Sequence, residues 1–412
     1  MMDINHLEES TLAKVCNLVT DGTHDTPKRV ESGYPLIKAK EIVGGRIDFD
    51  NCDQISRDEH LKVIARSKPE RGDTLFAHIG ASLGEAAYVN ANREFSIKNI
   101  ALFKPNPTVI DGRYLYYLVI SPQFQSHAKS SKTGSAQPFL SLGDLRAHRI
   151  HYHRDILVQR RIAGILSAYD DLIENNLRRI RILEEMARAL YREWFVHFRF
   201  PGHEAVPCVA SPFGPIPQGW EVKRVPECVD INPRVAVPRE GEKPFVPMGC
   251  LANDTMLITD IETRTGNSGA KFQNGDTLFA RITPCLENGK TGFVQFLPDA
   301  QTAAFGSTEF IVLRSRTLTP EFVYLLARSD EFRRNAIKSM TGASGRQRVQ
   351  ERCFDSFLIA QPPCSILDRF SALVAPDFRL IYQLHLQTQN LRSTRDLLLP
   401  RLLSGQVNLG ES

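Results

Sequence analysis

Gly72-Asp73-Thr74-Leu75-Phe76-Ala77 occurs a second time, unchanged, as Gly275-Asp276-Thr277-Leu278-Phe279-Ala280. A second set of matches lies at a constant separation of 208 residues, as between Tyr116 and Tyr324. The other pairs at that separation are Leu118/Leu326, Ser121/Ser329, Phe124/Phe332, Ala128/Ala336, Thr133-Gly134/Thr341-Gly342, Leu172-Ile173/Leu380-Ile381 and Leu183/Leu391. A duplication of this length predicts two similar modules in one chain, which meet two similar targets or two halves of one target.

Size and composition indicate an ordinary globular protein of at least two domains. The chain has 412 residues, of which 42% are hydrophobic and 24% charged. No apolar run approaches the roughly 18 residues of a membrane span, and the acidic N-terminus does not resemble a secretory signal. We therefore expect a cytoplasmic protein. Eight scattered cysteines without a Cys-x-x-Cys pair argue against a disulfide framework or a structural zinc site.

Each module is predicted to contain short strands, a helix and a loop. In the first module, from about Thr11 to His153, we expect strands at 35–38 and 73–77, a turn at 43–47, a helix over 113–129 and a loop at 133–138. The second module, from about Trp220 to Gln361, repeats the order with a helix over 320–338 and a loop at 341–345. Between the modules, a Pro- and Gly-rich stretch from 201 to 219 is typical of a linker.

A heptad pattern from Gln159 to Phe195 predicts a long helix. Apolar residues recur in steps of four and three, with one polar member, at Ile162, Leu166, Tyr169, Ile173, Asn176, Ile180, Leu183, Ala187, Leu190 and Trp194. At 1.5 Å per residue such a helix is roughly 55 Å long. An amphipathic helix lying on a globular core is the alternative, but the charge of the other face favours a coiled-coil rod. Asn176 is expected to fix the register of this rod.

A weaker copy of the pattern follows the second module. The positions 208 residues further on are Phe370, Val374, Asp377, Ile381, Leu384, Thr388, Leu391, Arg395, Leu398 and Leu402. Pro376 and Pro400 predict a break or kink near the start and near the end of this helix. The two apolar stripes are the nearest available partners for each other, so we expect the helices to pack together.

No catalytic motif is apparent. Asn288-Gly289-Lys290-Thr291 resembles the end of a phosphate-binding loop, but Pro284 stands where that motif requires glycine. His24-Asp25 lies in a Gly/Pro-containing segment that favours a turn over ligand contact, and ligand contact over catalysis. Asp170 and Asp171 point about 100° apart on a helix, so a solvated face is favoured over a metal site.

Basic residues concentrate around the repeated Thr-Gly pair. Residues 127–154 contain five Lys/Arg against one acid, and residues 328–352 contain seven against three. Arginine and lysine contact phosphates, whereas Gln, Ser and Thr can read base edges. The alternative is a basic surface loop without a ligand. The basic stretch occurs at equivalent positions in both modules, which favours a nucleic-acid partner, although the net charge of +4 is small.

At this point the chain resembles the specificity subunit of a Type I restriction–modification system, over nearly its whole length. The resemblance rests on the duplicated order of module and long helix, and on local segments at 21–27, 32–37, 72–77, 133–138, 275–280 and 397–405. It implies an α+β fold with two mixed α/β target-recognition domains, two long helices packed as an antiparallel coiled coil, and a pseudo-twofold repeat. The implied boundaries are 1–153 and 220–361 for the domains, 154–200 and 362–405 for the helices, 201–219 for the linker and 406–412 for a tail.

The resemblance also implies a function. Each domain would read one half of a bipartite double-stranded DNA site, and the helices would act as a spacer that binds two modification subunits. Partner chains would carry out methylation, and restriction subunits would carry out cleavage. The S-adenosylmethionine, ATP and Mg that these reactions need would also bind to partner chains. We expect no catalytic residue, metal or cofactor here. The second loop continues as Gly345-Arg346-Gln347-Arg348 in place of Ser-x-Gln-Pro, so the half-sites are expected to differ.

Two sets of candidate residues follow. The DNA-contact candidates, chosen by side-chain type, are Thr23, His24, Lys38, Lys40, His78, Lys132, Thr133, Ser135, Gln137, Arg281, Thr341, Ser344, Arg346, Gln347 and Arg348. The helix-seam candidates are Ile162, Leu166, Tyr169, Ile173, Asn176, Ile180, Leu183, Leu190, Ile381, Leu384, Leu391 and Leu398. The alternatives are a DNA methyltransferase or nuclease with its own active site, and a coiled-coil scaffold that binds only protein.

Overall fold

The computed structural model describes residues 7–130, 139–212, 214–343 and 345–407. The chain divides into two compact units: unit 1 contains residues 1–173 and 390–412, and unit 2 contains residues 174–389. Both long helices, α6 (Ile156–Tyr191) and α10 (Cys364–Leu403), contribute residues to each unit. None of the described helices combines the length and apolar character that crossing a membrane requires.

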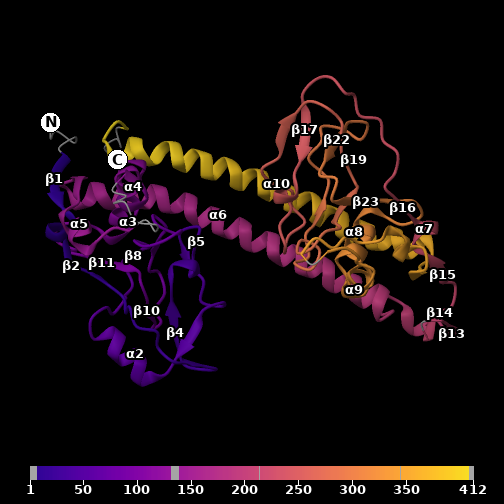
Figure 1. Cartoon of the computed structure of the whole chain (residues 1–412), viewed down its shortest axis with the longest axis horizontal. Helices are drawn as coiled ribbons and strands as arrows, with labels where there is room; N and C mark the ends of the chain where they lie inside the picture. Colours follow the sequence, from indigo (N-terminus) through magenta and orange to yellow (C-terminus); the bar gives the residue numbers. More distant parts are fainter. Residues whose placement is uncertain (1–6, 131–138, 213, 344, 408–412) are drawn as a thin grey trace. The chain divides into compact units, whose positions relative to one another are not determined.

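Unit 1 contains two four-stranded sheets (Figure 1). The first has the order β2 (Cys16–Asp21), β11 (Ala101–Pro105), β8 (Thr74–Phe76), β9 (Ala86–Tyr88), with antiparallel neighbours. The second has the order β10 (Ser96–Ile97), β4 (Tyr34–Ile37), β7 (Asp53–Ile55), β3 (Arg29–Val30), and its β10–β4 pair is parallel. Smaller pairs are β1 (Leu7–Thr11) with β12 (Arg149–His153), and β5 (Ile42–Val43) with β6 (Arg46–Ile47). The helices are α1 (Leu12–Val15), α2 (Arg57–Ile64), α3 (Gly112–Ile120), α4 (Pro122–Ser130) and α5 (Leu142–Ala147).

Unit 2 also contains two four-stranded sheets. The first has the order β16 (Val229–Ile231), β23 (Phe310–Ser315), β20 (Thr277–Ala280), β21 (Thr291–Phe293). The second has the order β18 (Glu262–Arg264), β17 (Lys243–Val246), β22 (Ala303–Gly306), β19 (Ala270–Gln273), with a parallel β17–β22 pair. Two-stranded pairs join β13 (Cys208–Ser211) to β14 (Gly214–Pro217) and β15 (Glu221–Arg224) to β24 (Leu358–Gln361). The helices are α7 (Val225–Cys228), α8 (Pro320–Arg328) and α9 (Asp330–Lys338).

The repeated hexapeptide contains an inner strand of the first sheet in each unit, β8 and β20. Its Leu and Phe side chains are fully buried, and they enter different hydrophobic clusters because alternate residues of a strand face opposite sides of the sheet. Burial raises the pKa of both aspartates, Asp73 and Asp276, and the hydrogen bonds from Lys104 and Arg314 oppose that shift. The hexapeptide is therefore a framework element in both units.

Both predicted central helices are interrupted, which corrects the expectation of single helices over 113–129 and 320–338. The interruptions fall at Ser121, between α3 and α4, and at Ser329, between α8 and α9. Each serine has an extended backbone, and its Oγ donates to the carbonyl three residues before it, at 2.6 Å and 2.7 Å. Each Oγ also accepts from the amide of the phenylalanine three residues later, so it caps the second helix.

The long helices form, with two corrections. Helix α6 is followed by a π-helical turn at Arg192–Val196, close to the predicted end. Helix α10 continues through Pro376 and Pro400, so the predicted breaks are wrong. The missing amide bonds are offset by packing, because Phe370, Val374 and Phe378 on either side of Pro376 are buried. The predicted linker at 201–219 contains the β13–β14 hairpin, so it is more ordered than expected.

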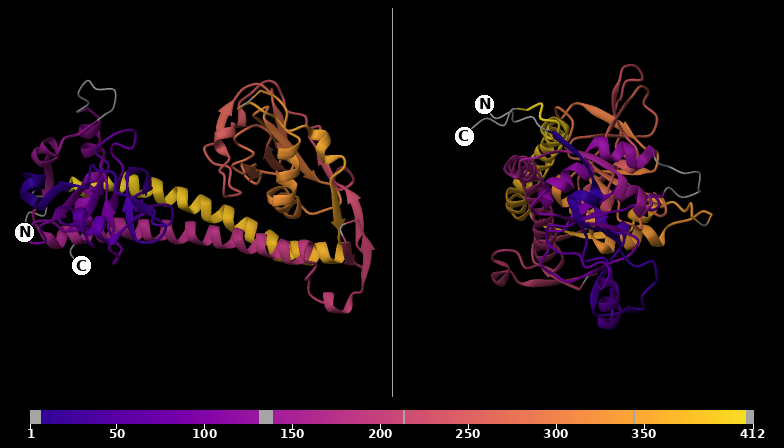
Figure 2. Two further views of the ribbon diagram at one scale, coloured as in Figure 1. Left: turned by 60° about the horizontal axis from the view of Figure 1, so that its bottom comes forward. Right: turned by 90° about the vertical axis from the view of Figure 1, so that its left-hand side faces the viewer.

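Within each unit the two long helices lie side by side and run antiparallel (Figures 1 and 2). In unit 1, Asp170 pairs with Arg395, and His153, which precedes α6, lies against Leu402. In unit 2, Asn176 donates to Gln387 at 3.1 Å, and the Trp194 ring lies 5.8 Å from that of Phe370.

The seam candidates are inward-facing in the described structure. The buried members are Ile162, Leu166, Ile173, Asn176, Ile180, Ile381 and Leu384, and the half-buried members are Tyr169, Leu183, Leu190, Leu391 and Leu398.

Candidate nucleic-acid interface

The loop that follows β2 in unit 1 is held against a second loop. A Cβ atom at Gly22 would overlap the carbonyl oxygen of Ile97, so only glycine fits this close approach. The amide of Thr23 donates to Ile97 O at 3.1 Å, and the amide of Asn99 donates to Thr23 O at 3.2 Å. The amide of Asp25 donates to Thr23 Oγ1 at 3.1 Å, which confirms the predicted turn at His24-Asp25.

A buried carboxylate organises the surface of this loop. Asp21 is 3% exposed; it lies 2.8 Å from Nε2 of His24 and accepts a second hydrogen bond from Arg66. Nδ1 of His24 lies 2.9 Å from Oδ1 of Asn99. The side chains of His24 and Arg66 are nevertheless 55% and 57% exposed. Asp21 thus holds the side chains of an arginine and a histidine at the surface.

Four members of this cluster were absent from the candidate set: Asp21, Arg66, Lys98 and Asn99. Lys98 donates to Thr26 Oγ1 and completes the group. Arg66 is 45 residues from Asp21, and Asn99 is 75 residues from His24. No local pattern connects residues so far apart, so only the positions within the 21–27 segment could be found from the sequence.

Lys38 and Lys40 lie near acidic partners. Lys38 donates to Asp53, and this hydrogen bond lowers the pKa of the Asp53 carboxyl against a smaller effect of burial. Lys40 is 69% exposed and lies 3.2 Å from Glu41. Lys38 therefore supports the second sheet of unit 1, whereas Lys40 is accessible to a ligand.

His78 and Arg281 occupy the same place, one residue after each hexapeptide. Nδ1 of His78 lies 2.8 Å from Leu140 O, and Nη2 of Arg281 lies 3.2 Å from Val349 O. The backbone bonds Leu140 N to His78 O and Val349 N to Arg281 O accompany them. His78 is 1% exposed, which does not agree with its predicted surface contact, and burial lowers its pKa. Both side chains anchor the segment that follows a Thr-Gly pair.

In unit 2, the loop after Thr341 is closed by paired backbones. Thr341 and Arg348 exchange amide-to-carbonyl bonds of 3.1 and 2.9 Å. The Arg348 guanidinium also donates to both oxygens of Glu309, with bonds of 2.7 to 3.0 Å. Those bonds lower the pKa of the Glu309 carboxyl. Arg281 is similarly paired with Glu351 at 2.9 Å, while Arg346 is exposed and Gln347 half-buried.

The register of the sheets relates two of these partners. In unit 1 the hexapeptide residue Phe76 pairs with Ala101, and Asn99 lies two residues before Ala101. In unit 2 the equivalent Phe279 pairs with Ile311, and Glu309 lies two residues before Ile311. Asn99 contacts His24, and Glu309 contacts Arg348. One framework position therefore holds a basic side chain in each unit, with different residues in the two cases.

The remaining DNA-contact candidates lie outside the described residues: Lys132, Thr133, Ser135, Gln137 and Ser344. Among the residues that are described, no group of three or more His, Cys, Asp or Glu side chains is arranged to hold a metal ion.

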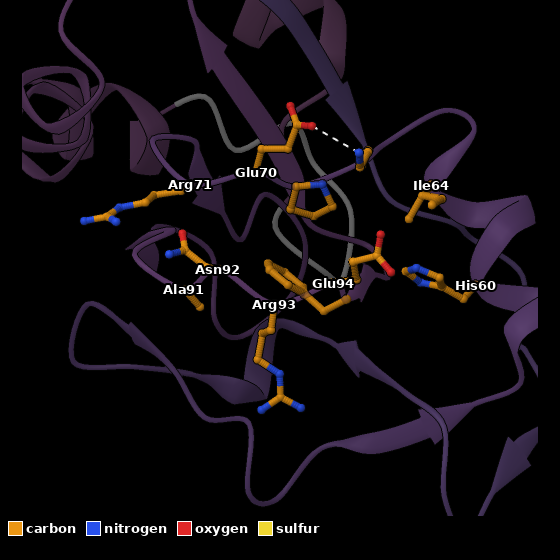
Figure 3. Close-up of a pocket in the computed structure, with 11 residues that line it drawn as sticks. His60, Ile64, Glu70, Arg71, Ala91, Asn92, Arg93 and Glu94 are labelled. Carbon is orange, nitrogen blue, oxygen red and sulfur yellow. Dashed lines mark ion pairs between the residues drawn. The ribbon is translucent and has the colours of Figure 1, made fainter.

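A cavity of about 190 Å³ lies in unit 1 (Figure 3). His60 is buried at its wall, stacks on Tyr34 with ring centroids 4.0 Å apart, and has Nδ1 2.9 Å from Ser96 Oγ. Figure 3 shows the Glu94 carboxylate beside the His60 ring, while Arg93 points away from it. Burial lowers the pKa of His60, and Glu94 opposes the shift. These contacts hold α2 on the second sheet.

The chain is similar to known proteins. Residues 5–185 match the family model of the Type I restriction modification DNA specificity domain. The chain is 28% identical over 312 residues to the Type I restriction enzyme MjaIX specificity subunit of Methanocaldococcus jannaschii, covering 72% of this chain and 69% of that protein. It is 32% identical over 170 residues to the EcoEI specificity subunit of Escherichia coli, covering 39% of this chain and 28% of that protein.

The fold is also similar to that of a solved structure. The S subunit of a Type I restriction–modification system from M. genitalium aligns with a TM-score of 0.59 and 12% identity, covering 97% of each chain. Specificity subunits are the DNA-recognition component of these systems and not the catalytic one. Residues 5–185 of this chain thus match the Type I restriction modification DNA specificity domain, and the chain is similar to the specificity subunits of these systems.

Proposed function

We propose that units 1 and 2 each read one half of a bipartite site in double-stranded DNA. The observation that carries this proposal is the shared position of Asn99 and Glu309. In each unit this position borders a loop and holds a basic side chain at the surface. The framework is shared, but the side chains differ, which favours two different half-sites read by two copies of one module.

The strand order supports the duplication. The order β2-β11-β8-β9 in unit 1 matches β16-β23-β20-β21 in unit 2, with the hexapeptide in the third strand of each. Both units also pair one strand of the second sheet in parallel with its neighbour. The flanking strands β3 and β19 take different places, so the second sheets agree only in part.

Helices α6 and α10 are proposed to form one antiparallel coiled coil that sets the separation of the half-sites. Each helix contributes to both units, and the contacts between the helices run in the antiparallel sense in each. A helix of 36 residues is roughly 54 Å long, comparable to about 16 base pairs of DNA. Their solvent-facing sides would receive two modification subunits.

The chemistry is proposed to reside in partner chains in the cytoplasm. Modification subunits would transfer a methyl group from S-adenosylmethionine, and restriction subunits would use ATP and Mg for cleavage. This chain would determine the DNA sites at which these reactions occur. This chain would contribute no catalytic group to either reaction.

Selection from a random DNA library tests the proposal. The full chain is reconstituted with its modification subunits, and bound DNA is recovered over several rounds. We expect two short constant segments separated by a gap of constant length. Enrichment of a single uninterrupted site, or of no site, would rule the proposal out.

A further inference from the structure

The Asp21 cluster of unit 1 consists of Asp21, His24, Arg66, Lys98 and Asn99, and it contains groups that can bind the phosphates of a DNA backbone. Arg66 carries five N–H donors, of which the bond to Asp21 uses one. Lys98 carries three, and its bond to Thr26 uses one. Among the described contacts both cations therefore retain unused donors. The Arg66 side chain is exposed, and Lys98 is half-buried.

Two oxygen acceptors of this cluster, Oδ1 of Asn99 and the carboxylate of Asp21, are already engaged. Asn99 is bonded to His24, and the carboxylate of Asp21 is bonded to His24 and Arg66. What remains at the surface is a set of cations with the hydroxyls of Thr23 and Thr26. Cationic and hydroxyl side chains commonly donate to the phosphates of DNA.

Burial of Asp21 gives this set a fixed geometry. An exposed arginine loses side-chain entropy when it binds, but one whose guanidinium is anchored to a buried carboxylate is already ordered. Three segments meet at this place: the 21–27 loop, the end of α2, and the 97–99 loop. The cations are thus presented together although they are far apart in the sequence.

We propose that Arg66, Lys98 and His24 form a phosphate clamp that grips the DNA backbone at the half-site of unit 1, with Asp21 as its positioning residue. The inference rests on the proposed function and adds the ligand group: a backbone phosphate and not a base. Arg66 supplies affinity that is independent of sequence, whereas discrimination between bases comes from other residues of the unit.

The salt dependence of binding tests the clamp. The full chain is measured with its modification subunits. Arg66→Gln should make the negative slope of log K against log salt shallower by about 0.9, because one phosphate contact is lost. Arg66→Lys should retain most of the slope. The matched control is Lys14→Gln, which removes one exposed charge in α1 at the other end of β2 and should leave the slope unchanged. Thermal melting checks that each variant is folded.

Uncharged methylphosphonate linkages, placed singly along the site, identify the DNA partner. At one or two positions the substitution should weaken wild-type binding but not the binding of Arg66→Gln, because the contact is already lost. The clamp is wrong if Arg66→Gln keeps the wild-type slope, or if it changes the preferred base at one position. A wild-type chain without any split-site preference would instead contradict the proposed function, and the slope comparison could still be read.

Discussion

The carboxylate of Asp170 joins three elements of unit 1, because it accepts hydrogen bonds from both Tyr117 and Arg395. The Tyr117 hydroxyl of α3 donates to one oxygen at 2.6 Å, and Arg395 of α10 donates to the other at 2.7 Å. Asp170 itself belongs to α6. The expectation that Asp170 lies on a solvated face is therefore wrong. Arg395 occupies a seam position where an apolar residue would be usual, and Asp170 is its partner there.

Asp170→Asn should loosen this junction. The variant keeps an acceptor for Tyr117 but loses the ion pair with Arg395, whose partly buried guanidinium then keeps only the pair with the more exposed Asp396. We expect a loss of about 1–3 kcal/mol in the free energy of unfolding, measured by urea denaturation. Asp171→Asn on the neighbouring, more exposed position is the control and should change stability by less than about 0.5 kcal/mol. Equal losses in the two variants would show that the junction contributes nothing.

Glu309→Gln should release Arg348 toward DNA. The ion pair with Glu309 neutralises the arginine at the edge of the unit 2 loop. Without the carboxylate, Arg348 can neutralise a phosphate, so binding to random DNA should tighten and its salt slope should steepen by up to about 0.9. Glu262→Gln, which breaks the Glu262–Arg264 pair of β18, is the matched control. Tightening of equal size in both variants would reflect net charge alone.

Acid should destabilise unit 1 through its buried histidines. Burial lowers the pKa of His60 and His78, and burial with His127 lowers the pKa of His148 to about 4. In the unfolded chain these histidines have an ordinary pKa of about 6.5, so below that pH the unfolded chain binds protons that the folded chain does not bind. Stability is therefore full above pH 6.5 and falls between about pH 6.5 and 4.

Replacing His148 isolates its share of this loss. His148→Gln cannot titrate, so the decrease in the free energy of unfolding from pH 7 to pH 5 should be smaller than in the wild type, by on the order of 1 kcal/mol. His151→Gln, at a 45% exposed position, serves as the control. The same decrease in all three proteins would contradict the assignment.

Elements set by local patterns were predictable from the sequence, and those set by distant partners were not. The hexapeptide strand and the inward face of α6 follow from periodicities of two and 3.6 residues. The breaks at Ser121 and Ser329 depend on a side chain replacing a backbone bond, and the continuation of α10 through Pro376 depends on the residues packed around it. The Asp21–Arg66 pair required the fold, because no window of sequence contains both residues.

The length of the helical pair should set the gap between half-sites. Deleting one heptad from α6 and the facing heptad from α10 shortens each helix by about 10 Å, which corresponds to at most about three base pairs. We expect a shorter gap with unchanged half-sites in the selected DNA. Deletion in only one helix should misalign the seam and lower stability. An unchanged gap in a folded double-deletion variant would mean that the helices are not the spacer.

The central claim is that this chain directs modification to a split DNA site, and the methylome of its host tests it most directly. Sequencing that detects methylated bases is performed before and after deletion of the gene, and after its return on a plasmid. We predict a methylated motif of two short segments separated by a gap of constant length, which disappears on deletion and returns with the gene. A methylome that is unchanged by the deletion, or the loss of a motif without a gap, would contradict the account.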